Sequence, residues 1–374
     1  MGEHEVAVIG AGPAGIATAI SLQERGVRPL VIDRASQMVA SWRARYDRLK
    51  LNTGRQFSHL PGRRYPKGTP TFPTRDQVIE HFEGHAREAD VQVRLNTTVH
   101  RIDPGDGGGW RLGASTGDID ARHVVVATGL MHTPFMPDWL NRGGFGGEVL
   151  HSSQYRNTET FRDKRVLVVG SGSSGMEIAH DLATGGAAKV WMAVRTPPNI
   201  MLRGGPGGLP GEVISLPLFH APIRLADALA LKARRRFIGD LSEFGLPLPD
   251  EGPFGRLARA GAVPSLVDLE VIDAIRDRSI EVVAGVQGFD GESVRLVDGR
   301  GLKPDAVICA TGYHNGLDPM VGHLGVLDER GEPRAGWDRP AARGLWFIGF
   351  SRRPALIGYV GKQSRRLAKK IANT

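Results

Sequence analysis

The sequence predicts an α/β fold with two Rossmann-like domains, the second inserted into a discontinuous first. At residues 5–15 and again at 165–183, a buried-strand pattern runs through a glycine-rich turn into a helical pattern. A third apolar strand pattern, "GLWFIGF" at residues 344–350, precedes a helix expected from about residue 360 to 372. Because this strand and helix follow the second glycine-rich turn, we expect the chain to return there to its first domain.

The first glycine-rich turn has the spacing of a dinucleotide-binding site. Gly10 permits the sharp turn, Gly12 lets backbone N–H groups approach a pyrophosphate, and Gly15 lets the helix pack closely on the strand. The second strand, residues 28–33, ends in Asp33, whose carboxylate can accept hydrogen bonds from ribose hydroxyls. We therefore expect a dinucleotide without a ribose 2′-phosphate at this turn.

The second turn repeats the pattern with Gly170, Gly172 and Gly175, but the strand that follows, residues 188–195, ends in Arg195. An acidic residue at that place would repel a ribose 2′-phosphate, whereas an arginine can bind it with two hydrogen bonds. A solvated charge at the strand end is the alternative interpretation of Arg195. Two dinucleotides of different kinds in one chain indicate a redox relay, and we expect FAD at the first turn and NADPH at the second.

Two strand patterns that end in Ala-Thr-Gly are expected where the chain crosses between the domains. They are "HVVVATG" at residues 123–129 and "DAVICATG" at 305–312. The expected FAD-binding domain comprises residues 1–160 and 305–374, and the expected NADPH-binding domain comprises residues 161–304.

The composition is that of an ordinary globular protein and limits the chemistry. The 374 residues are 41% hydrophobic and 24% charged. Cys309 is the only cysteine, which excludes a disulfide framework, a redox-active cysteine pair and a cysteine-rich metal site. The net charge of +8 fits a protein that handles polyanionic cofactors, and a nucleic-acid binder is the alternative, although the basic runs lack interleaved aromatic residues. No apolar run is long enough to span a bilayer, and we expect a soluble, cytoplasmic protein.

The segment "FGGEVLHSSQY", residues 145–155, carries a family resemblance. Phe145, Gly147, His151 and Tyr155 match the fingerprint F-x-G-x-x-x-H-x-x-x-Y. With this segment the chain resembles the class B flavoprotein monooxygenases, and among them the flavin-containing monooxygenase and plant YUCCA-like branch. The Baeyer–Villiger branch is similar as far as the His but ends the fingerprint with Trp instead of Tyr. The resemblance covers nearly the whole chain, with further matching motifs at residues 41–61, 72–82 and 310–313.

This resemblance implies an NADPH- and O2-dependent monooxygenase that contains FAD. NADPH would reduce the flavin, O2 would be captured as a flavin C4a-hydroperoxide, and one oxygen atom would pass to a nitrogen or sulfur centre of a small organic substrate. Two enzymatic alternatives stay open. One is oxygenation at a carbonyl, as in Baeyer–Villiger reactions or 2-oxo acid decarboxylation, and the other is an NADPH-dependent electron-transfer flavoprotein or oxidase. The oligomeric state is also open, with a dimer among the alternatives.

The resemblance also assigns site residues. Asn52 falls where flavin-containing monooxygenases place an Asn beside the isoalloxazine ring and where YUCCA-like enzymes tend to have His; a loop-capping Asn before Gly54 is the alternative. His151 lies in the segment that links the two nucleotide domains in the family, and a positioning role is favoured for it over direct chemistry. Trp42 and Arg48 are candidates for FAD contacts. The expected catalytic residues are Asn52 and His151, and the expected cofactor ligands are Gly10, Gly12, Gly15, Asp33, Arg34, Trp42, Gly170, Gly172, Gly175, Arg195, Thr311, Gly312 and Gly349.

Residues 200–265 are expected to select the substrate or to close over a cofactor. The Gly/Pro-rich stretch at residues 201–212 is too long for a tight connection, which favours a lid or cofactor clamp. Residues 221–239 have a helical pattern with a basic end, and a helix packed on the core is favoured over one lying on a membrane.

Overall fold

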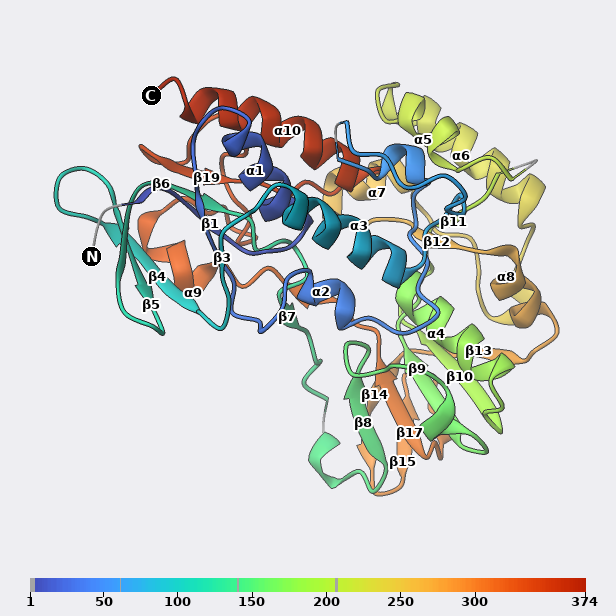
Figure 1. Cartoon of the computed structure of the whole chain (residues 1–374). Helices are drawn as coiled ribbons and strands as arrows, with labels where there is room; N and C mark the ends of the chain where they lie inside the picture. Colours follow the sequence, from blue (N-terminus) through green and yellow to red (C-terminus); the bar gives the residue numbers. More distant parts are fainter. Residues whose placement is uncertain (1–3, 61, 140, 206–207) are drawn as a thin grey trace. The chain divides into compact units, whose positions relative to one another are not determined.

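The computed structural model describes residues 4–60, 62–139, 141–205 and 208–374. The chain forms two compact units. Unit 1 contains the chain up to Ala44, Gly54–Thr133 and Tyr313–Thr374, and unit 2 contains Arg45–Thr53 and Pro134–Gly312. Unit 1 is therefore discontinuous, and both ends of the chain, blue and red in Figure 1, belong to it.

Unit 1 is built on a seven-stranded sheet with the strand order β3-β2-β1-β6-β5-β4, in which β19 also pairs with β6. β1 lies parallel to β2 and β6, with Ala7 opposite both Leu30 and Val124. Val6, Ala7 and Val8 are fully buried, as expected for a parallel strand covered on both faces. The strands are β1 (His4–Ile9), β2 (Leu30–Ile32), β3 (Val93–Arg94), β4 (Val99–Pro104), β5 (Trp110–Ala114), β6 (Ile119–Val126) and β19 (Leu345–Phe347).

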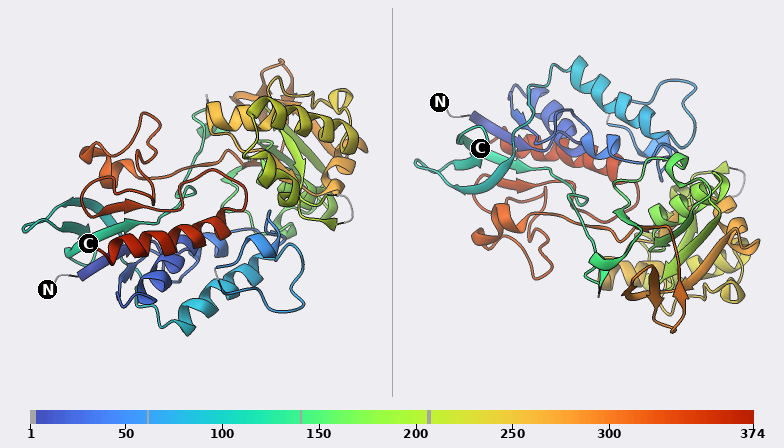
Figure 2. Two further views of the ribbon diagram at one scale, coloured as in Figure 1. Left: turned by 90° about the horizontal axis from the view of Figure 1, so that it is seen from above. Right: turned by 90° about the horizontal axis from the view of Figure 1, so that it is seen from below.

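The C-terminal helix α10 of unit 1 packs along α1. The hydroxyl oxygens of Ser21 in α1 and Ser364 in α10 lie 3.0 Å apart, and Figure 2 shows red α10 beside the blue N-terminal segment. Together with the parallel pairing of β19 to β6, this confirms the return of the chain to its first sheet. The helices are α1 (Pro13–Gln23), α2 (Ala40–Arg43), α3 (Arg75–Glu88), α9 (Asp318–Val321) and α10 (Leu356–Ile371), with short 3-10 turns η1 (Arg55–Phe57) and η6 (Gly322–Leu324).

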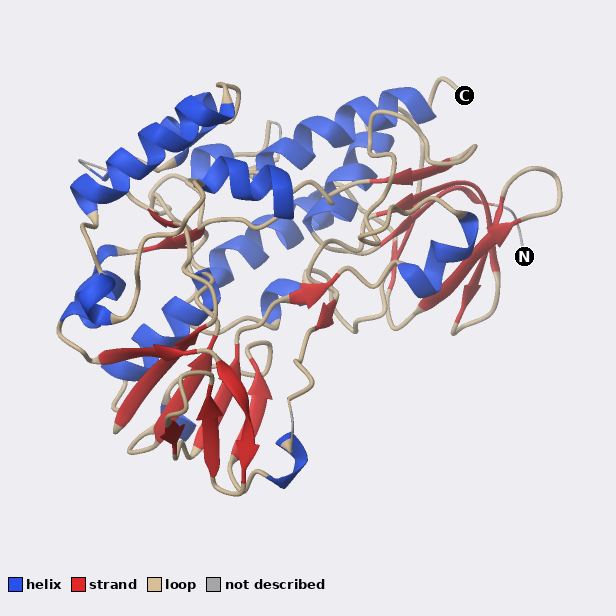
Figure 3. Cartoon of the chain, turned by 180° about the vertical axis from the view of Figure 1, so that it is seen from behind, coloured by secondary structure: helices blue, strands red, loops and turns tan. Residues whose placement is uncertain are grey.

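Unit 2 is built on a five-stranded parallel sheet with the order β13-β10-β9-β17-β8. Figure 3 draws the strands of the chain in red and its helices in blue. Val168 of β9 lies opposite Met192 of β10 and Ile308 of β17, and all three are fully buried. The sheet strands are β8 (Glu148–His151), β9 (Arg165–Val169), β10 (Lys189–Val194), β13 (Ile280–Ala284) and β17 (Ala306–Cys309). Smaller sheets contain β11 (Ile200–Leu202) with β12 (Ser265–Val267), and β14 (Val286–Asp290) with β15 (Ser293–Leu296) and β16 (Gly301–Leu302). β7 (Thr133–Pro134) and β18 (Tyr313–His314) lie where the chain crosses between the units.

The helices of unit 2 include one whose leucines face outward, against expectation. They are α4 (Ser173–Thr184), α5 (Glu212–Leu218), α6 (Ile223–Phe237), α7 (Pro253–Ala260) and α8 (Leu269–Arg276), with 3-10 turns η2 (Arg142–Gly144), η3 (Glu159–Phe161) and η5 (Ser242–Phe244). The expectation that α6 packs on the core holds for one face of the helix only. Of its residues only Ala226 and Arg234 are buried, whereas Leu225 and Leu229 are 53% and 45% exposed. The two leucines lie four residues apart on one face of the helix. On the opposite face, the buried Arg234 donates to the carbonyl oxygen of Pro198 at 2.8 Å.

The expected lid and the question of a membrane-spanning helix can be considered next to α6. Residues 206 and 207 of the expected lid at 201–212 lie outside the described part of the chain. Within the described residues, no helix combines the length and the apolar character that crossing a membrane requires.

The boundaries of the two units differ from the expected 160/161 and 304/305. β8 pairs with β17, with His151 opposite Cys309, so the fingerprint strand belongs to the second sheet. Unit 2 also extends through Gly312 and includes Arg45–Thr53. The physical reason is that a four-residue strand takes its place through pairing with residues far along the chain, and such pairing leaves no local signal in the sequence.

His81 of α3 makes stability depend on pH. Its ring stacks on that of Tyr65 with 3.9 Å between the ring centroids, and the residue is 6% exposed. Burial, helped by the nearby His85, His59 and Arg63, lowers the pKa of His81 to about 3. The pKa of a histidine in the unfolded chain is about 6.5. Between these values the unfolded chain takes up a proton that the folded chain does not, so the free energy of unfolding falls as the pH falls from about 6.5 towards 3.

We expect urea unfolding to show this loss between about pH 7 and about pH 5, and a His81→Phe variant to reduce it by up to about 2 kcal/mol. His100→Gln is the matched control, because His100 is exposed. An unchanged pH dependence in His81→Phe would contradict the prediction.

Candidate cofactor-binding and active-site residues

The first glycine-rich turn has the geometry of a phosphate cradle. Gly10 has a φ of +111°, and a Cβ there would lie 2.7 Å from the carbonyl oxygen of Ala127. A Cβ on Gly15 would lie 1.7 Å from the carbonyl oxygen of Gly10, so only glycine lets α1 approach the turn. A Cβ on Gly12 would meet no described atom within 4 Å, and no described side chain caps the N-terminus of α1. This open space in front of free N–H groups fits a pyrophosphate.

Asp33 lies beside this turn, as the sequence predicts. Its Oδ2 accepts the N–H of Ala11 at 2.6 Å, and its Oδ1 accepts that of Ala35 at 2.8 Å. The carboxylate is thereby fixed, and each oxygen keeps a lone pair that a ribose hydroxyl can use. Arg34 is exposed and donates to the carbonyl oxygen of His132 at 3.1 Å, while Trp42 of α2 is half-buried.

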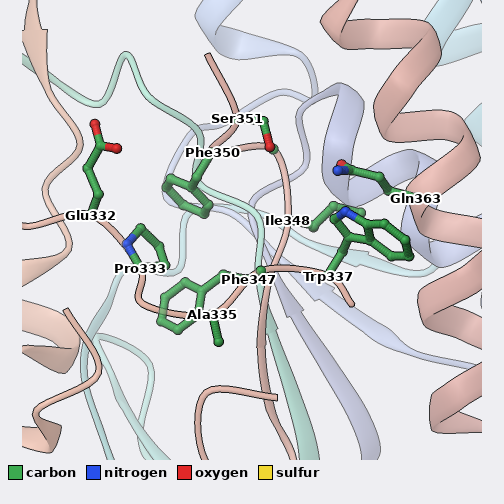
Figure 4. Close-up of a pocket in the computed structure, with 11 residues that line it drawn as sticks. Glu332, Pro333, Ala335, Trp337, Phe347, Ile348, Phe350, Ser351 and Gln363 are labelled. Atoms are coloured by element: carbon green, nitrogen blue, oxygen red, sulfur yellow. The ribbon is translucent and has the colours of Figure 1, made fainter. Parts of the chain in front are cut away.

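The C-terminal return brings Gly349 to the same turn. Its φ is +88°, and a Cβ there would lie 3.0 Å from the Cβ of Ala14 at the start of α1. A pocket of about 100 Å³ lies beside Gly349, and Figure 4 shows Trp337 and Gln363 on its wall. The Gln363 amide is buried without a hydrogen-bond partner among the described residues. Sites for larger ligands measure roughly 300 Å³ or more, so this pocket alone is too small for a dinucleotide.

The second glycine-rich turn reproduces the geometry of the first. Gly170 has a φ of +115°, and its Cβ would lie 2.5 Å from the carbonyl oxygen of Ala310. A Cβ on Gly175 would lie 2.0 Å from the carbonyl oxygen of Gly170, whereas one on Gly172 would meet no described atom within 4 Å. No described side chain caps the N-terminus of α4. The second turn therefore also fits a pyrophosphate.

Arg195 follows directly after β10, at the edge of the sheet where this turn lies. Its side chain is exposed, and a Cβ on Gly285 would lie 3.3 Å from its Cα. No hydrogen bond or ion pair joins its guanidinium to another described residue. The guanidinium is therefore available to bind a phosphate, although its exposure alone is equally typical of a solvated charge.

His151 ends β8 and is 2% exposed. Its Nδ1 accepts the backbone N–H of Ser153 at 3.1 Å, which leaves the ring proton on Nε2, 3.0 Å from the carbonyl oxygen of Gly312. Burial lowers the pKa of His151, against the opposing effect of that carbonyl. Next to Gly312, Thr311 donates through its hydroxyl to the carbonyl oxygen of Phe135. Thr311 and Gly312 thus lie with His151 in unit 2, not in the unit of the first turn.

The other fingerprint residues are parts of the core of unit 2. Tyr155 is fully buried and its hydroxyl donates to Asp181 Oδ2 at 2.7 Å; burial raises the pKa of this hydroxyl. Phe145 packs against Phe289 with 5.1 Å between the ring centroids. A Cβ on Gly147 would lie 2.7 Å from the carbonyl oxygen of Asp305, which explains the glycine. The fingerprint therefore fixes a strand and its His at the edge of the second sheet.

Asn52 has a partner that the sequence did not reveal. Its Oδ1 accepts a hydrogen bond from Arg203 Nη2 at 3.2 Å. Arg203 is 2% exposed and pairs with Glu177 of α4 and with Asp268. Arg48, a candidate for FAD contact, pairs with Asp181 of α4 at 3.0 Å. The signal for Arg203 was a lone arginine after the short apolar strand β11, a pattern also typical of an ordinary loop charge.

Two dinucleotide-type turns on separate sheets define an oxidoreductase of the two-nucleotide class. Residues 7–200 match the family described as pyridine nucleotide-disulphide oxidoreductase. The chain is 34% identical over 370 residues to the probable indole-3-pyruvate monooxygenase YUCCA7 of Arabidopsis thaliana, covering 92% of this chain and 83% of that protein. It is also 34% identical over 363 residues to the indole-3-pyruvate monooxygenase YUCCA1 of Oryza sativa subsp. japonica, covering 93% and 87%.

A solved structure agrees on the fold. The flavin-containing monooxygenase from Stenotrophomonas maltophilia superposes with a TM-score of 0.74 at 21% identity, covering 100% of this chain and 99% of that one. The chain belongs to the class B flavoprotein monooxygenases, in the YUCCA-like branch. It is an FAD-containing, NADPH- and O2-dependent monooxygenase that acts on a small-molecule substrate. When bound, the flavin accepts the hydride and activates O2. The protein binds and orients the cofactors and the substrate and shields them from water.

Proposed function

We propose that this enzyme oxygenates a nitrogen or sulfur centre of a small organic molecule. One atom of O2 bonds to the lone pair of a tertiary amine or a sulfide and gives the N-oxide or S-oxide. The other atom leaves as water, whose two hydrogens come from the NADPH hydride and one proton, and NADP⁺ is released. The observation that supports this proposal is the Asn52 amide, a neutral group that can present an N–H donor. A neutral donor suits delivery of an electrophilic oxygen to a lone pair, whereas attack on a carbonyl needs a nucleophilic oxygen.

The cofactor ligands belong to the same proposal. Gly10, Gly12 and Gly15 with Asp33 would hold FAD in unit 1, and Arg34, Trp42 and Gly349 are its further candidate ligands. In unit 2, the second turn and Arg195 would hold NADPH. Thr311 and Gly312 are proposed to act at the cofactors through their place beside His151.

We propose a positioning role for His151, because both of its ring nitrogens already bond to the chain. A His151→Phe variant removes the hydrogen bond between this ring and the carbonyl oxygen of Gly312, at a cost of about 0.5–1.5 kcal/mol. The expected result is an increase in the KM for NADPH of about tenfold with unchanged FAD content. Steady-state kinetics with flavin absorbance measure both quantities. A loss confined to kcat, at unchanged KM, would point to direct chemistry by His151.

A second candidate reaction is the oxidative decarboxylation of a 2-oxo acid, in which O2, NADPH and one proton convert the acid to CO2, water, NADP⁺ and the carboxylic acid shorter by one carbon. The plant relatives, which are named as indole-3-pyruvate monooxygenases, favour it. The experiment that separates the two is a substrate panel of tertiary amines, sulfides, cyclic ketones and indole-3-pyruvate, with product mass and NADPH consumption measured together. Amine or sulfide oxides in amounts equal to NADPH consumed support our proposal, and oxygenated products from the keto compounds alone would overturn it.

The setting of the enzyme is proposed on simpler grounds. Cys309 is buried, and burial raises its pKa to about 12, as expected for an inert thiol. A chain with one cysteine forms no internal disulfide, which suits a reducing cytoplasm. We propose that the net charge of +8 serves the binding of polyanionic cofactors and that the enzyme has no nucleic-acid partner. A dimer is one of the oligomeric states that light scattering would distinguish.

A further inference from the structure

The segment Arg45–Thr53 is fixed to unit 2 by its own side chains. The Tyr46 hydroxyl donates to Glu177 of α4. Arg48 Nη1 donates to Asp181 Oδ1, also on α4, at 3.0 Å. The segment thus follows the helix that begins at the second glycine-rich turn, although its neighbours in sequence on both sides belong to unit 1.

At Asn52 the anchor is a buried guanidinium. Arg203 Nη2 donates to Asn52 Oδ1 at 3.2 Å, and Arg203 Nη1 donates to Asp268 Oδ2 at 3.0 Å. Glu177 forms a second ion pair with the same guanidinium. Burial lowers the pKa of Arg203, with Asp268 acting in the opposite direction, and an arginine stays protonated at neutral pH even so. Two carboxylates around one planar group fix its orientation.

The chemistry of that guanidinium decides which way the Asn52 amide faces. An arginine side chain has N–H donors and no acceptor, so the atom of Asn52 that meets Arg203 has to be the amide oxygen. The amide nitrogen, with its two N–H groups, is then directed away from Arg203. Rotating the amide by 180° would place N–H against N–H and lose the hydrogen bond.

We propose that Arg203 is a positioning residue that holds the Asn52 amide with its N–H donor presented towards the reacting centre. This inference rests on the role proposed above for Asn52. Arg203 itself touches neither substrate nor cofactor in this account, because it is buried between Glu177 and Asp268.

Two variants separate orientation from simple support. Asn52→Asp keeps an oxygen for Arg203 but has no N–H to present. Arg203→Lys keeps the buried charge for Glu177 and Asp268 but loses the planar fork that reaches three partners at once. Arg165→Lys is the control, since Arg165 pairs with Asp305 on the exposed surface of unit 2, at 2.8 Å.

The first readout is the substrate-free oxidation of NADPH by the FAD-loaded enzyme, measured with the H2O2 that it releases. We expect both variants to raise this rate about tenfold, the effect of one lost hydrogen bond, with an unchanged KM for NADPH. The double variant should raise it no further than either single one, because both remove the same donor. The second readout needs no catalysis: hydrogen exchange of the backbone amides of residues 51–53 should quicken in Arg203→Lys and not in Arg165→Lys.

A purely structural Arg203 gives a different result, in which Arg203→Lys lowers the urea midpoint while NADPH oxidation stays at the wild-type rate. That result overturns the proposal. A wild-type rate of NADPH oxidation in Asn52→Asp also overturns it, and this second test can be made even if Arg203→Lys does not fold. Neither readout uses an organic substrate. Absence of amine or sulfide oxides would therefore contradict the proposed function alone.

Discussion

A Gly12→Ala variant is expected to fold normally and to retain less than about a tenth of the wild-type FAD. Gly12 has a φ of −85° and a ψ of −174°, which any residue adopts, and a Cβ would meet no described atom within 4 Å. Alanine should therefore leave the fold unchanged, while its methyl group occupies the space through which the pyrophosphate approaches the N–H groups. Flavin absorbance per protein and thermal unfolding of the apoprotein measure the two effects.

The matched variant is Gly172→Ala at the second turn. Gly172 has a φ of −71° and a ψ of 171°, and its Cβ would also meet no described atom within 4 Å. We expect it to keep FAD and to raise the KM for NADPH by at least about tenfold. Gly15→Ala provides a contrast, because its Cβ would lie 1.7 Å from a backbone oxygen and should lower stability itself. Loss of FAD in Gly172→Ala with retention in Gly12→Ala would reverse the assignment of the two cofactors.

The second large effect is expected at Arg195. Replacement by alanine removes charge-assisted hydrogen bonds to the 2′-phosphate, worth about 1.5–3 kcal/mol, so kcat/KM for NADPH should fall roughly tenfold to a hundredfold. The value for NADH, which lacks this phosphate, should hardly change. Initial rates with both nucleotides measure the ratio, and Arg162→Ala, at the end of η3 and outside both glycine-rich turns, is the control. An equal fall with NADPH and NADH would mean that Arg195 supports the strand end and does not read the phosphate.

The sequence was sufficient for the parts of the fold that local patterns encode. Each glycine-rich turn combines a buried strand, positive φ at Gly10 or Gly170, and a close helix contact at Gly15 or Gly175, and all of these follow from residue type and spacing. The return of the C-terminal strand to the first sheet was also predictable, because an apolar strand after the inserted domain needs a sheet to pair with.

The parts that the sequence did not reveal depend on contacts between distant residues. Asn52 meets Arg203 across 151 positions, and His151 meets Gly312 across 161. Neither pairing has a period or a spacing that a sequence pattern can show. The same holds for the strand β8, whose sheet is decided by its pairing with β17. It also holds for α6, in which Leu225 and Leu229 look like part of a core stripe but lie on the exposed face.

The most direct test of the central claim is oxygen labelling with ¹⁸O2. The purified enzyme is supplied with NADPH and with a tertiary amine or sulfide, and the product is analysed by mass spectrometry. We expect one ¹⁸O atom in each molecule of N-oxide or S-oxide, with one NADPH consumed per product. Label recovered only in H2O2 or water, or only in the shortened acid formed from a 2-oxo acid, would contradict oxygen transfer to nitrogen or sulfur.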